Sequence, residues 1–244
     1  MQRRRGGTNK MGGTLSGSPL GVPDTPRLAC VAVAAYHGCM RVIDPGTGRA
    51  YLEKRRKRYN NPREPRELTF SCYRRYPFLV RNQVREWFRE ALEEARRKFG
   101  FQLWAYVLMP EHAHLLVYPG DAPEQISRFL QALKGPVARK AVAYLKANDP
   151  TWLARLTVRE GQRVRHRLWQ PGGGYDRNIT RSLTLRSAIE YFHANPVRRK
   201  LVARAEDWEW SSARWFAGIR PVPIEMDKMV LMELSREGPR WAER

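Results

Sequence analysis

The clearest periodic pattern in the chain lies between Val80 and Phe99. Apolar side chains recur there every three or four residues, which places them on one side of a helix. They are Val84, Trp87, Phe88, Ala91, Leu92, Ala95 and Phe99. Gly100 follows, and glycine is the residue that most often ends a helix. The pattern predicts an amphipathic helix with one buried face.

Two further segments have helical spacing. One opens at Pro123–Glu124 and is expected to break or kink at Gly135–Pro136. The other runs from Thr184 to Ala194, and Pro196 is expected to stop it. Their apolar positions include Ile126, Phe129, Leu130, Leu133, Leu185, Ala188, Ile189 and Phe192. Both helices should therefore pack on a common core.

Strands are predicted at Leu68–Tyr73, at Phe101–Leu108 and, after a turn at Pro110, at His112–Val117. The last two are close enough in sequence to be antiparallel neighbours. The order strand, helix, strand, strand, helix, helix predicts an α+β fold. We expect a ferredoxin-like antiparallel sheet with helices packed on one face. The polar segment 148–167 gives no clear element, and residues 206–216 are expected to be helical in their second half.

The flanking segments differ from this main domain. A hairpin is predicted from Met40–Ile43 and Ala50–Leu52, and the basic run Lys54–Arg58 after it is either a solvated face or a phosphate contact. The predicted organisation is a disordered basic tail (1–26), an extension with the hairpin and a basic linker (27–66), the main domain (67–218) and a C-terminal tail (219–244).

The charge narrows the range of partners. Lys and Arg number 45 against 24 Asp and Glu, a formal net charge of +21. This excess indicates a polyanionic partner, most simply nucleic acid, and eight Trp and ten Tyr would suit stacking on unpaired bases if they were not in the core. We expect no membrane association, because no apolar run reaches about 18 residues. Three widely spaced cysteines favour no disulfide framework and a cytoplasmic location.

The candidate chemistry begins with His112 and His114. Residues two apart on a strand point to the same face, so both imidazoles would aim at one point and form half of a metal site. The alternative is two ordinary strand residues. Tyr191 and Asn195 are four apart on the third helix and share a face. Asn supplies an amide oxygen suited to a hard cation such as Mg²⁺ or Mn²⁺, and the Tyr phenol would be a nucleophile beside it.

Four motifs occur in order along the chain. They are Met109–Val117 (MPEHAHLLV), Leu168–Pro171 (LWQP), Tyr191–Arg198 (YFHANPVR) and Asp207–Ser212 (DWEWSS). Over about residues 68–216 the chain resembles the single-tyrosine HUH transposases, especially the REP-associated tyrosine transposase branch. Many relatives have a histidine, after an acid, soon after the Trp-Gln motif. Here Arg177 follows Asp176, so this chain departs from that pattern.

The resemblance implies a metal-dependent nuclease and strand transferase for single-stranded DNA, which often lies next to a hairpin. It implies that His112, His114 and Asn195 hold the metal. Tyr191 would be the nucleophile, and the product a 5′-phosphotyrosine with a free 3′-hydroxyl. Six basic residues are candidate DNA contacts, the last three because they follow the tyrosine helix: Arg165, Arg167, Arg177, Arg198, Arg199 and Lys200.

Other interpretations remain open at this stage. The chain could be a nucleic-acid-binding protein on the same scaffold that no longer cuts DNA. A replication or mobilisation initiator and a zinc hydrolase without a DNA role are further alternatives. Tyr144 is the competing nucleophile, since it also lies on a predicted helix with an asparagine four residues later. The sequence predicts neither the target DNA nor the oligomeric state.

Overall fold

The computed structural model describes residues 39–43, 50–54 and 60–229, the first two ranges as backbone only. The chain divides into two units, residues 1–36 and 37–244, and every described residue belongs to the second. The predicted tail, most of the basic linker and the last fifteen positions of the C-terminal tail lie outside the described residues. Strand β1 (Cys39–Ile43) pairs antiparallel with β2 (Ala50–Lys54), which confirms the predicted hairpin.

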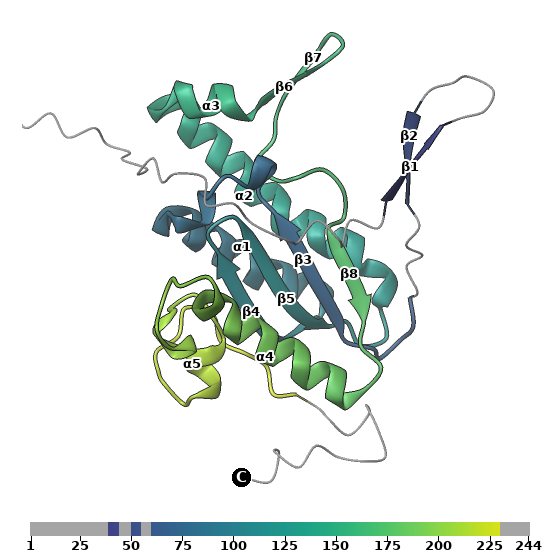
Figure 1. Cartoon of the computed structure of the whole chain (residues 1–244), viewed down its shortest axis with the longest axis vertical. Coiled ribbons are helices and arrows are strands. Elements are labelled where there is room, and N and C mark those ends of the chain that lie inside the picture. Colours follow the sequence, from purple (N-terminus) through teal and green to yellow (C-terminus); the bar gives the residue numbers. More distant parts are fainter. Residues whose placement is uncertain (1–38, 44–49, 55–59, 230–244) are drawn as a thin grey trace, which may run out of the picture. The chain divides into compact units, whose positions relative to one another are not determined.

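A four-stranded antiparallel sheet forms the centre of the fold (Figure 1). Its order is β4-β5-β3-β8, and its strands are β3 (Arg66–Ser71), β4 (Gln102–Met109), β5 (His112–Tyr118) and β8 (Tyr175–Asn178). The predicted antiparallel pairing of β4 with β5 is confirmed. Strand β8 was not predicted. It is short and polar, and it exists because β3 offers it an edge to pair with.

The predicted helices are present, and two of them continue through a proline. The helices are α1 (Asn82–Phe99), α2 (Ile126–Asn148), α3 (Pro150–Leu156), α4 (Ser182–Arg198) and α5 (Ala213–Phe216). The connections of the described chain include the 3-10 turns η1 (Tyr73–Arg75) and η2 (Phe78–Val80) between β3 and α1, η3 (Pro123–Gln125) before α2, and η4 (Ala205–Asp207) between α4 and α5. Gly100 ends α1 in the left-handed conformation (φ 66°), as expected.

The expected stop of the third helix at Pro196 was wrong. Helix α2 was expected to break or kink at Gly135–Pro136, and it does not break there. Helix α2 runs on past Pro136, since Leu133 before it and Val137 after it are both buried in the core. Helix α4 runs on to Arg198 with Pro196 inside it. Pro196 has no N–H to donate to the Phe192 carbonyl, but Phe192, Asn195 and Pro196 are all buried, so packing holds this turn helical.

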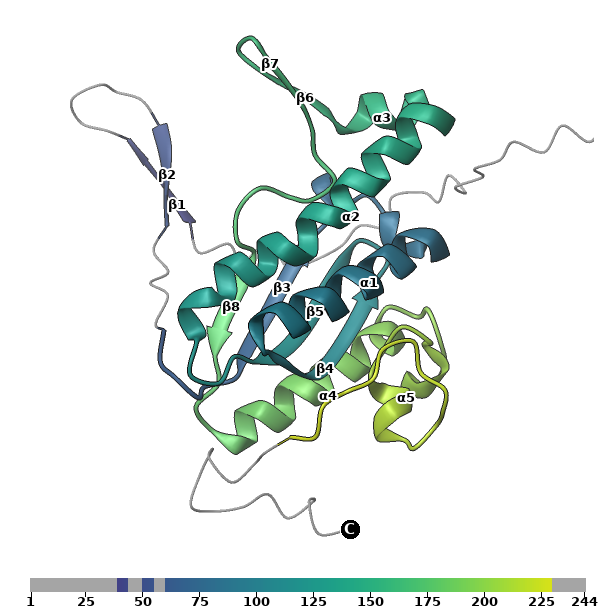
Figure 2. The same cartoon turned by 180° about the vertical axis from the view of Figure 1, so that it is seen from behind.

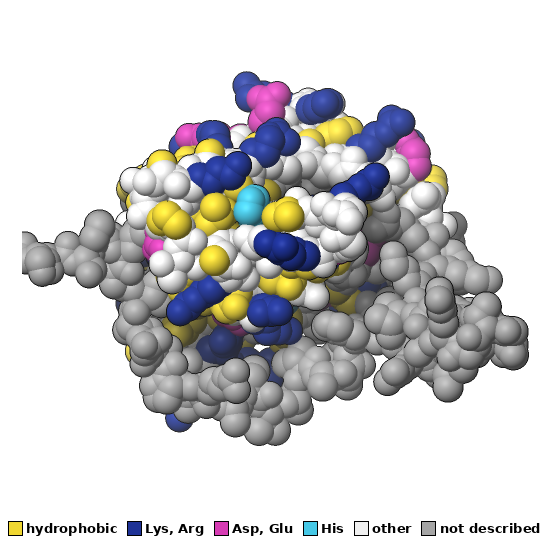
Figure 3. Space-filling model, turned by 90° about the horizontal axis from the view of Figure 1, so that it is seen from above, with side chains coloured by type: hydrophobic (Ala, Val, Ile, Leu, Met, Phe, Trp, Pro, Cys, Tyr) yellow, Lys and Arg dark blue, Asp and Glu magenta, His cyan; other side chains and the backbone are white. Residues whose placement is uncertain are grey.

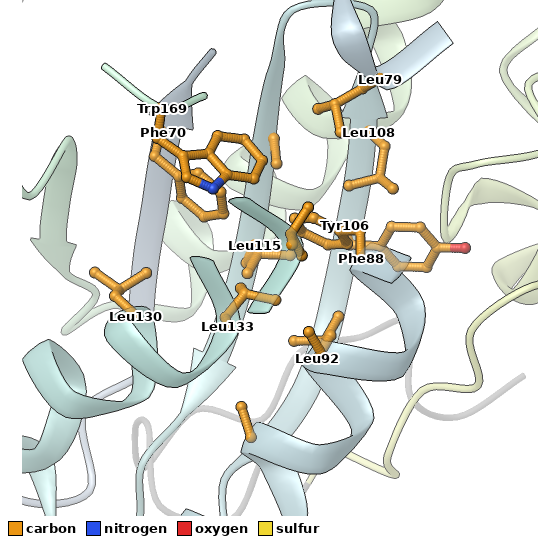
Figure 4. Close-up of a cluster of buried hydrophobic side chains, with 14 of the residues drawn as sticks. Phe70, Leu79, Phe88, Leu92, Tyr106, Leu108, Leu115, Leu130, Leu133 and Trp169 are labelled. Carbon is orange, nitrogen blue, oxygen red and sulfur yellow. The ribbon is translucent and has the colours of Figure 1, made fainter. Parts of the chain in front are cut away.

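The helices cover both faces of the sheet, and the prediction of one covered face was wrong. Helices α1 and α2 lie on one face and α4 on the other, as the two opposite views show (Figures 1 and 2). Figure 4 shows Phe88 and Leu92 of α1 and Leu133 of α2 beside Leu115 of the sheet. Strand β4 explains this arrangement. Its run from Leu103 to Met109 is wholly apolar rather than alternating, so both of its faces need cover.

Segment 148–167, which had no clear prediction, forms α3 and a second hairpin. Asp149 accepts a hydrogen bond from the Trp152 amide (3.0 Å) and so caps α3. Strand β6 (Thr157–Glu160) then pairs antiparallel with β7 (Arg163–His166) outside the main sheet. Within the described part of the chain, no helix is long and apolar enough to cross a membrane.

Gly174 fixes how closely β8 approaches β3. Its backbone is left-handed (φ 72°), and a methyl group there would overlap the carbonyl oxygen of Thr69 on β3. Gly172, two residues earlier, is also left-handed (φ 96°), but a methyl group there would meet no atom within 4 Å. The two glycines therefore separate the effect of backbone conformation from that of close packing.

We expect Gly174→Ala to destabilise the fold more than Gly172→Ala. Left-handed strain alone should cost about 1–2 kcal/mol in either variant, which lowers the Tm by roughly 2–8 °C in a domain of this size. The overlap with Thr69 adds to this only in Gly174→Ala, whose loss of Tm should be at least about twice as large. Thermal unfolding followed by circular dichroism measures both. Equal Tm values would show that β8 is not held by this contact.

Candidate active site

The two histidines of β5 face helix α4 from the same side of their strand. His112 and His114 point toward α4, while Ala113 between them packs in the core on the other face. Their Nε2 atoms lie 3.0 Å apart, and the two residues are 8% and 5% exposed. The structure thus brings both imidazoles to one buried point, as the alternation of a strand predicts.

His112 has a fixed tautomer. Its Nδ1 lies 3.1 Å from Oε1 of Glu111, and an ionised carboxylate only accepts hydrogen bonds. Burial of Glu111 by itself would raise the carboxyl pKa. The hydrogen bond with His112 and the positive charge of Arg199 outweigh burial and lower this pKa to about 2. His112 therefore donates from Nδ1, and in the neutral ring the Nε2 lone pair points at His114.

His114 is held by Thr69, the residue opposite it on β3. Its Nδ1 lies 2.7 Å from the Thr69 hydroxyl oxygen, which either donates or accepts because a hydroxyl rotates. Burial, followed by the charge of His112, lowers the pKa of His114 well below its usual value, so the ring is neutral. If Thr69 accepts, both Nε2 lone pairs face each other. If Thr69 donates, His114 carries its hydrogen on Nε2 and donates a hydrogen bond to Nε2 of His112.

This geometry fits a bound cation. Two nitrogen ligands in neighbouring positions of an octahedron, each about 2.1 Å from the ion, lie about 3.0 Å apart. The separation of the two Nε2 atoms has this value. Metal-binding histidines typically donate their other ring N–H to a carboxylate or another acceptor, which is what Glu111 provides and Thr69 allows. The pair thus has the spacing and the hydrogen-bonding support that a metal site needs.

Asn195 is the third predicted ligand, and it is buried on α4 (7% exposed). Its side-chain Nδ2 has no hydrogen-bond partner among the described residues. The oxygen and nitrogen of an Asn side chain are assigned from their hydrogen-bond partners. With the amide rotated by 180°, the oxygen would occupy this unsatisfied position, where it could bind a cation. No group of three or more His, Cys, Asp or Glu able to hold a metal occurs in the described ranges. A cation here would therefore depend on the amide and on water.

Tyr191 lies at the mouth of this site, one turn before Asn195. Its ring stands edge-on to that of His114, with centroids 5.7 Å apart, while Phe192 packs on His114 at 5.0 Å. Phe192 is fully buried, whereas Tyr191 is 39% exposed. Arg198 lies over the Tyr191 ring at 5.5 Å. The phenol is therefore open to solvent beside the histidine pair and next to a positive charge.

Tyr144, the competing tyrosine, lies in another part of the fold. It is on α2, where its ring contacts that of Trp87 at 6.2 Å and packs against the core between the sheet and α1–α2. The histidines point to the opposite face of the sheet. Asn148, its partner by spacing, donates a hydrogen bond to the Tyr144 carbonyl instead of reaching a site (2.8 Å). The structure brings Tyr191 to the histidines and keeps Tyr144 apart from them.

Glu111 joins the histidines to the surrounding arginines. Its buried carboxylate forms an ion pair with Arg199, just after α4, and lies 3.8 Å from Nη1 of Arg75, after β3. Arg75 and its neighbour Arg74 both adopt left-handed backbone (φ 55° and 52°), a conformation that is uncommon for residues other than glycine. This turn bonds to the Trp-Gln motif, since the Tyr73 amide donates to the Leu168 carbonyl (2.7 Å).

Arg75 was missed by the sequence prediction. The available signal was the pair of arginines directly after β3, the strand that flanks the histidines, but nothing in the local pattern shows that the turn bends back toward Glu111. Lys200, at the end of α4, also has a positive φ (57°). Basic residues therefore reach the edge of the site from two separate turns.

The other predicted DNA contacts are distributed differently. Arg198 and Arg199 border the site through Tyr191 and Glu111. Arg165 and Arg167 both form ion pairs with Glu160 on the β6–β7 hairpin. Arg177 is on β8, where it pairs with Glu67 at 2.6 Å. The structure thus brings the α4 group to the histidines and places the remaining three elsewhere.

The remaining aromatic and histidine candidates are structural. Trp169 and Trp210 are buried, and Trp169 Nε1 donates to the Lys134 carbonyl (2.9 Å). His193 lies 2.9 Å from the Ser212 hydroxyl, and burial lowers its pKa to about 4. Trp169 and Trp210 belong to the core cluster on the α1–α2 side of the sheet, and His193 is held by Ser212.

Comparison with known proteins gives a family match and similar solved structures. Residues 67–171 match the family described as Transposase IS200 like, a range that includes the histidines and ends before Tyr191. A solved REP-associated tyrosine transposase bound to a REP hairpin is similar to the chain at 21% identity and a TM-score of 0.53. The match covers 76% of this chain and 99% of that one, and at this identity it shows a shared fold.

A protein assigned as a transposase in Deinococcus radiodurans R1 is also similar, at 24% identity and a TM-score of 0.36. That match covers 57% of this chain and 96% of the other. A comparison with curated protein sequences gives no match. Over residues 67–171, the chain is therefore similar to the IS200-like transposase family.

Proposed function

We propose that this transposase cleaves and rejoins single-stranded DNA through a covalent bond between Tyr191 and a 5′-phosphate, with Mg²⁺ or Mn²⁺ held by His112, His114 and Asn195. The observation that carries the proposal is the contact of the Tyr191 ring with His114, whose Nε2 faces that of His112 at 3.0 Å. A phenol, two imidazoles and a buried amide with an unsatisfied atom come from two elements that pack on each other.

The chemistry follows from these groups. A bound divalent cation would polarise a phosphate oxygen and stabilise the negative charge that develops on the phosphoryl oxygens. The Tyr191 oxygen attacks phosphorus, the bond to the 3′ oxygen breaks, and that oxygen takes up a proton while the phenol loses one. The new phosphotyrosine is still a phosphate diester. A 3′-hydroxyl can therefore attack it in the reverse sense, and strand rejoining needs no ATP.

The basic residues around the site would hold the DNA backbone. Arg198 over the Tyr191 ring lies where a phosphate would approach the phenol. Glu111 places Arg199 and orients His112 with one carboxylate, so DNA contact and metal support share one anchor. The REP hairpin in the similar structure supports DNA as the ligand.

A DNA-binding protein on the same scaffold without cutting activity is the alternative. It predicts binding without covalent product even when Mn²⁺ is supplied. The contacts of His112 with Glu111 and of His114 with Thr69 favour cutting. A surface that only binds DNA would need the arginines and would not need these contacts.

The metal proposal predicts that Thr69→Val weakens cation binding. Valine keeps the shape of threonine but cannot accept a hydrogen bond from Nδ1 of His114. The tautomer of His114 whose Nε2 lone pair is free for a cation is then no longer stabilised. We expect Mn²⁺ affinity to fall by about 10–100-fold. Loss of the free Mn²⁺ signal in an electron paramagnetic resonance titration, without DNA, measures this directly.

Thr157→Val is the matched control for this experiment. The Thr157 hydroxyl also contacts a histidine nitrogen, Nδ1 of His166 at 3.0 Å, but on the β6–β7 hairpin. The Thr157→Val variant should leave Mn²⁺ affinity unchanged. The double variant His112→Ala, His114→Ala should abolish Mn²⁺ binding. If Thr69→Val binds Mn²⁺ as tightly as Thr157→Val, Thr69 does not support a metal ligand.

The nucleophile proposal predicts that Tyr191→Phe forms no covalent DNA adduct. Phenylalanine keeps the ring that contacts His114 and Arg198, so the fold and DNA affinity should be unchanged within about twofold. Tyr144→Phe, which changes a tyrosine on the other face of the sheet, should form adduct at the wild-type level. Denaturing gels with a labelled unstructured oligonucleotide and Mn²⁺ read out both variants. A persistent adduct with Tyr191→Phe would refute the assignment.

A further inference from the structure

The β6–β7 hairpin contributes nothing to the core. Leu156 before it and Leu168 after it are fully buried, yet none of residues 157–167 is buried. It projects from the end of α3 as a two-stranded ribbon outside the main sheet (Figure 1). Packing of the core therefore does not depend on these side chains, so their composition has to be explained in another way.

That composition is strongly basic. Four arginines and one acid lie between residues 157 and 167. Glu160 forms ion pairs with Arg165 and Arg167, so these two predicted DNA contacts are already occupied. Arg159 and Arg163 are exposed, and neither has an ion-pair partner among the described residues. The uncompensated charge of the ribbon thus lies near its tip. Figure 3 looks down onto the side of the molecule from which the ribbon projects, and Lys and Arg outnumber Asp and Glu on that face.

The register places the two free arginines on opposite faces of the ribbon. Arg159 lies opposite Val164 and shares a face with it, whereas Arg163 lies opposite Glu160 on the other face. Val164 is 57% exposed, which is high for an apolar residue. Four residues per strand give the ribbon a length of about 13 Å. The major groove of duplex DNA, about 12 Å wide, admits a two-stranded β ribbon and has phosphates along both walls.

The chain that leaves the ribbon after β7 leads to the neighbourhood of the candidate active site. Trp169, three residues after β7, forms an isolated bridge with Cys72, and the Cys72 amide donates to the Glu111 carbonyl (2.8 Å). Three residues of chain span at most about 11 Å. A duplex held by the ribbon would therefore stand next to the strand that enters between Tyr191 and the histidines.

We propose that the β6–β7 ribbon docks the duplex stem of a DNA hairpin, with Arg159 and Arg163 on the phosphates of the two groove walls. This inference rests on the proposed function, because the single strand beside the stem is the one to be cut. Duplex DNA fits better than an anionic membrane surface, since positive charge lies on both faces of a narrow ribbon rather than on one flat side.

The test variant combines Arg159→Ser with Arg163→Ser. It is compared with a control variant that loses the same amount of charge. The control combines Arg97→Ser, in the last turn of α1, with Arg128→Ser, in the first turn of α2. Fluorescence anisotropy measures affinity for a hairpin with a single-stranded extension and for an unstructured strand of equal length. Thermal unfolding should give wild-type Tm values for the ribbon variant, because its residues are not buried.

We expect the ribbon variant to bind the hairpin about tenfold more weakly, with the slope of log K against log salt reduced by about 2. Its affinity for the unstructured strand, and its adduct formation on that strand, should match the control. Unchanged hairpin affinity would overturn the proposal, and so would an equal loss on both DNAs or a loss confined to anionic vesicles. If the wild type forms no adduct but the ribbon variant still loses hairpin binding selectively, the proposed function fails and the docking surface stands.

Discussion

The site depends on the packing of α4 against the histidine face of the sheet. Two neutral imidazoles cannot remain in a buried space with their lone pairs opposed unless a proton or a cation lies between them. Phe192 closes this space by packing on His114, and burial of such a side chain stabilises the packing by about 1.5–3 kcal/mol. The same helix carries Tyr191 one residue before Phe192 and Asn195 three residues after it. One packed helix therefore confines the histidines and carries both the proposed nucleophile and the proposed third ligand.

Electrostatic support surrounds this packing. Glu111 stays ionised although it is buried, because His112 and Arg199 stabilise its charge. Arg75 arrives on the other side from a left-handed turn, and Thr69 holds the second histidine across the β3–β5 pair. Gly174 brings β8 against the backbone of this same Thr69. The ordering of the histidines is thus linked to strand pairing as well as to charge.

Periodicity along the chain predicted the features that are local. The two-residue period of β5 put His112 and His114 on one face, and the spacing on α4 put Tyr191 and Asn195 on another. It did not predict that α4 lies on the face opposite α1 and α2, because that depends on which side of the sheet the chain crosses. The continuous apolar run of β4 was the available sign that both faces are covered.

Features held by distant contacts could not be predicted from the sequence. Strand β8 is polar and short, and only β3 makes it a strand. The β6–β7 ribbon has few apolar residues, so its hydrophobic pattern was too weak to show a period. Arg165 and Arg167 were predicted as candidate DNA contacts, and in the fold both form ion pairs with Glu160. Charge runs in the sequence show total charge, and only the fold shows which charges are already paired.

The most direct test of the central claim is to locate the nucleotide on the wild-type protein. The adduct formed with an unstructured strand and Mn²⁺ is digested with nuclease and trypsin, and the modified peptide is identified by mass spectrometry. Cleavage after Arg186 and Arg198 gives a peptide in which Tyr191 is the single tyrosine, and cleavage after Lys140 and Lys146 gives one for Tyr144. The account predicts a 5′-phosphonucleotide on the Tyr191 peptide alone. A nucleotide on the Tyr144 peptide, or on any other, would contradict it.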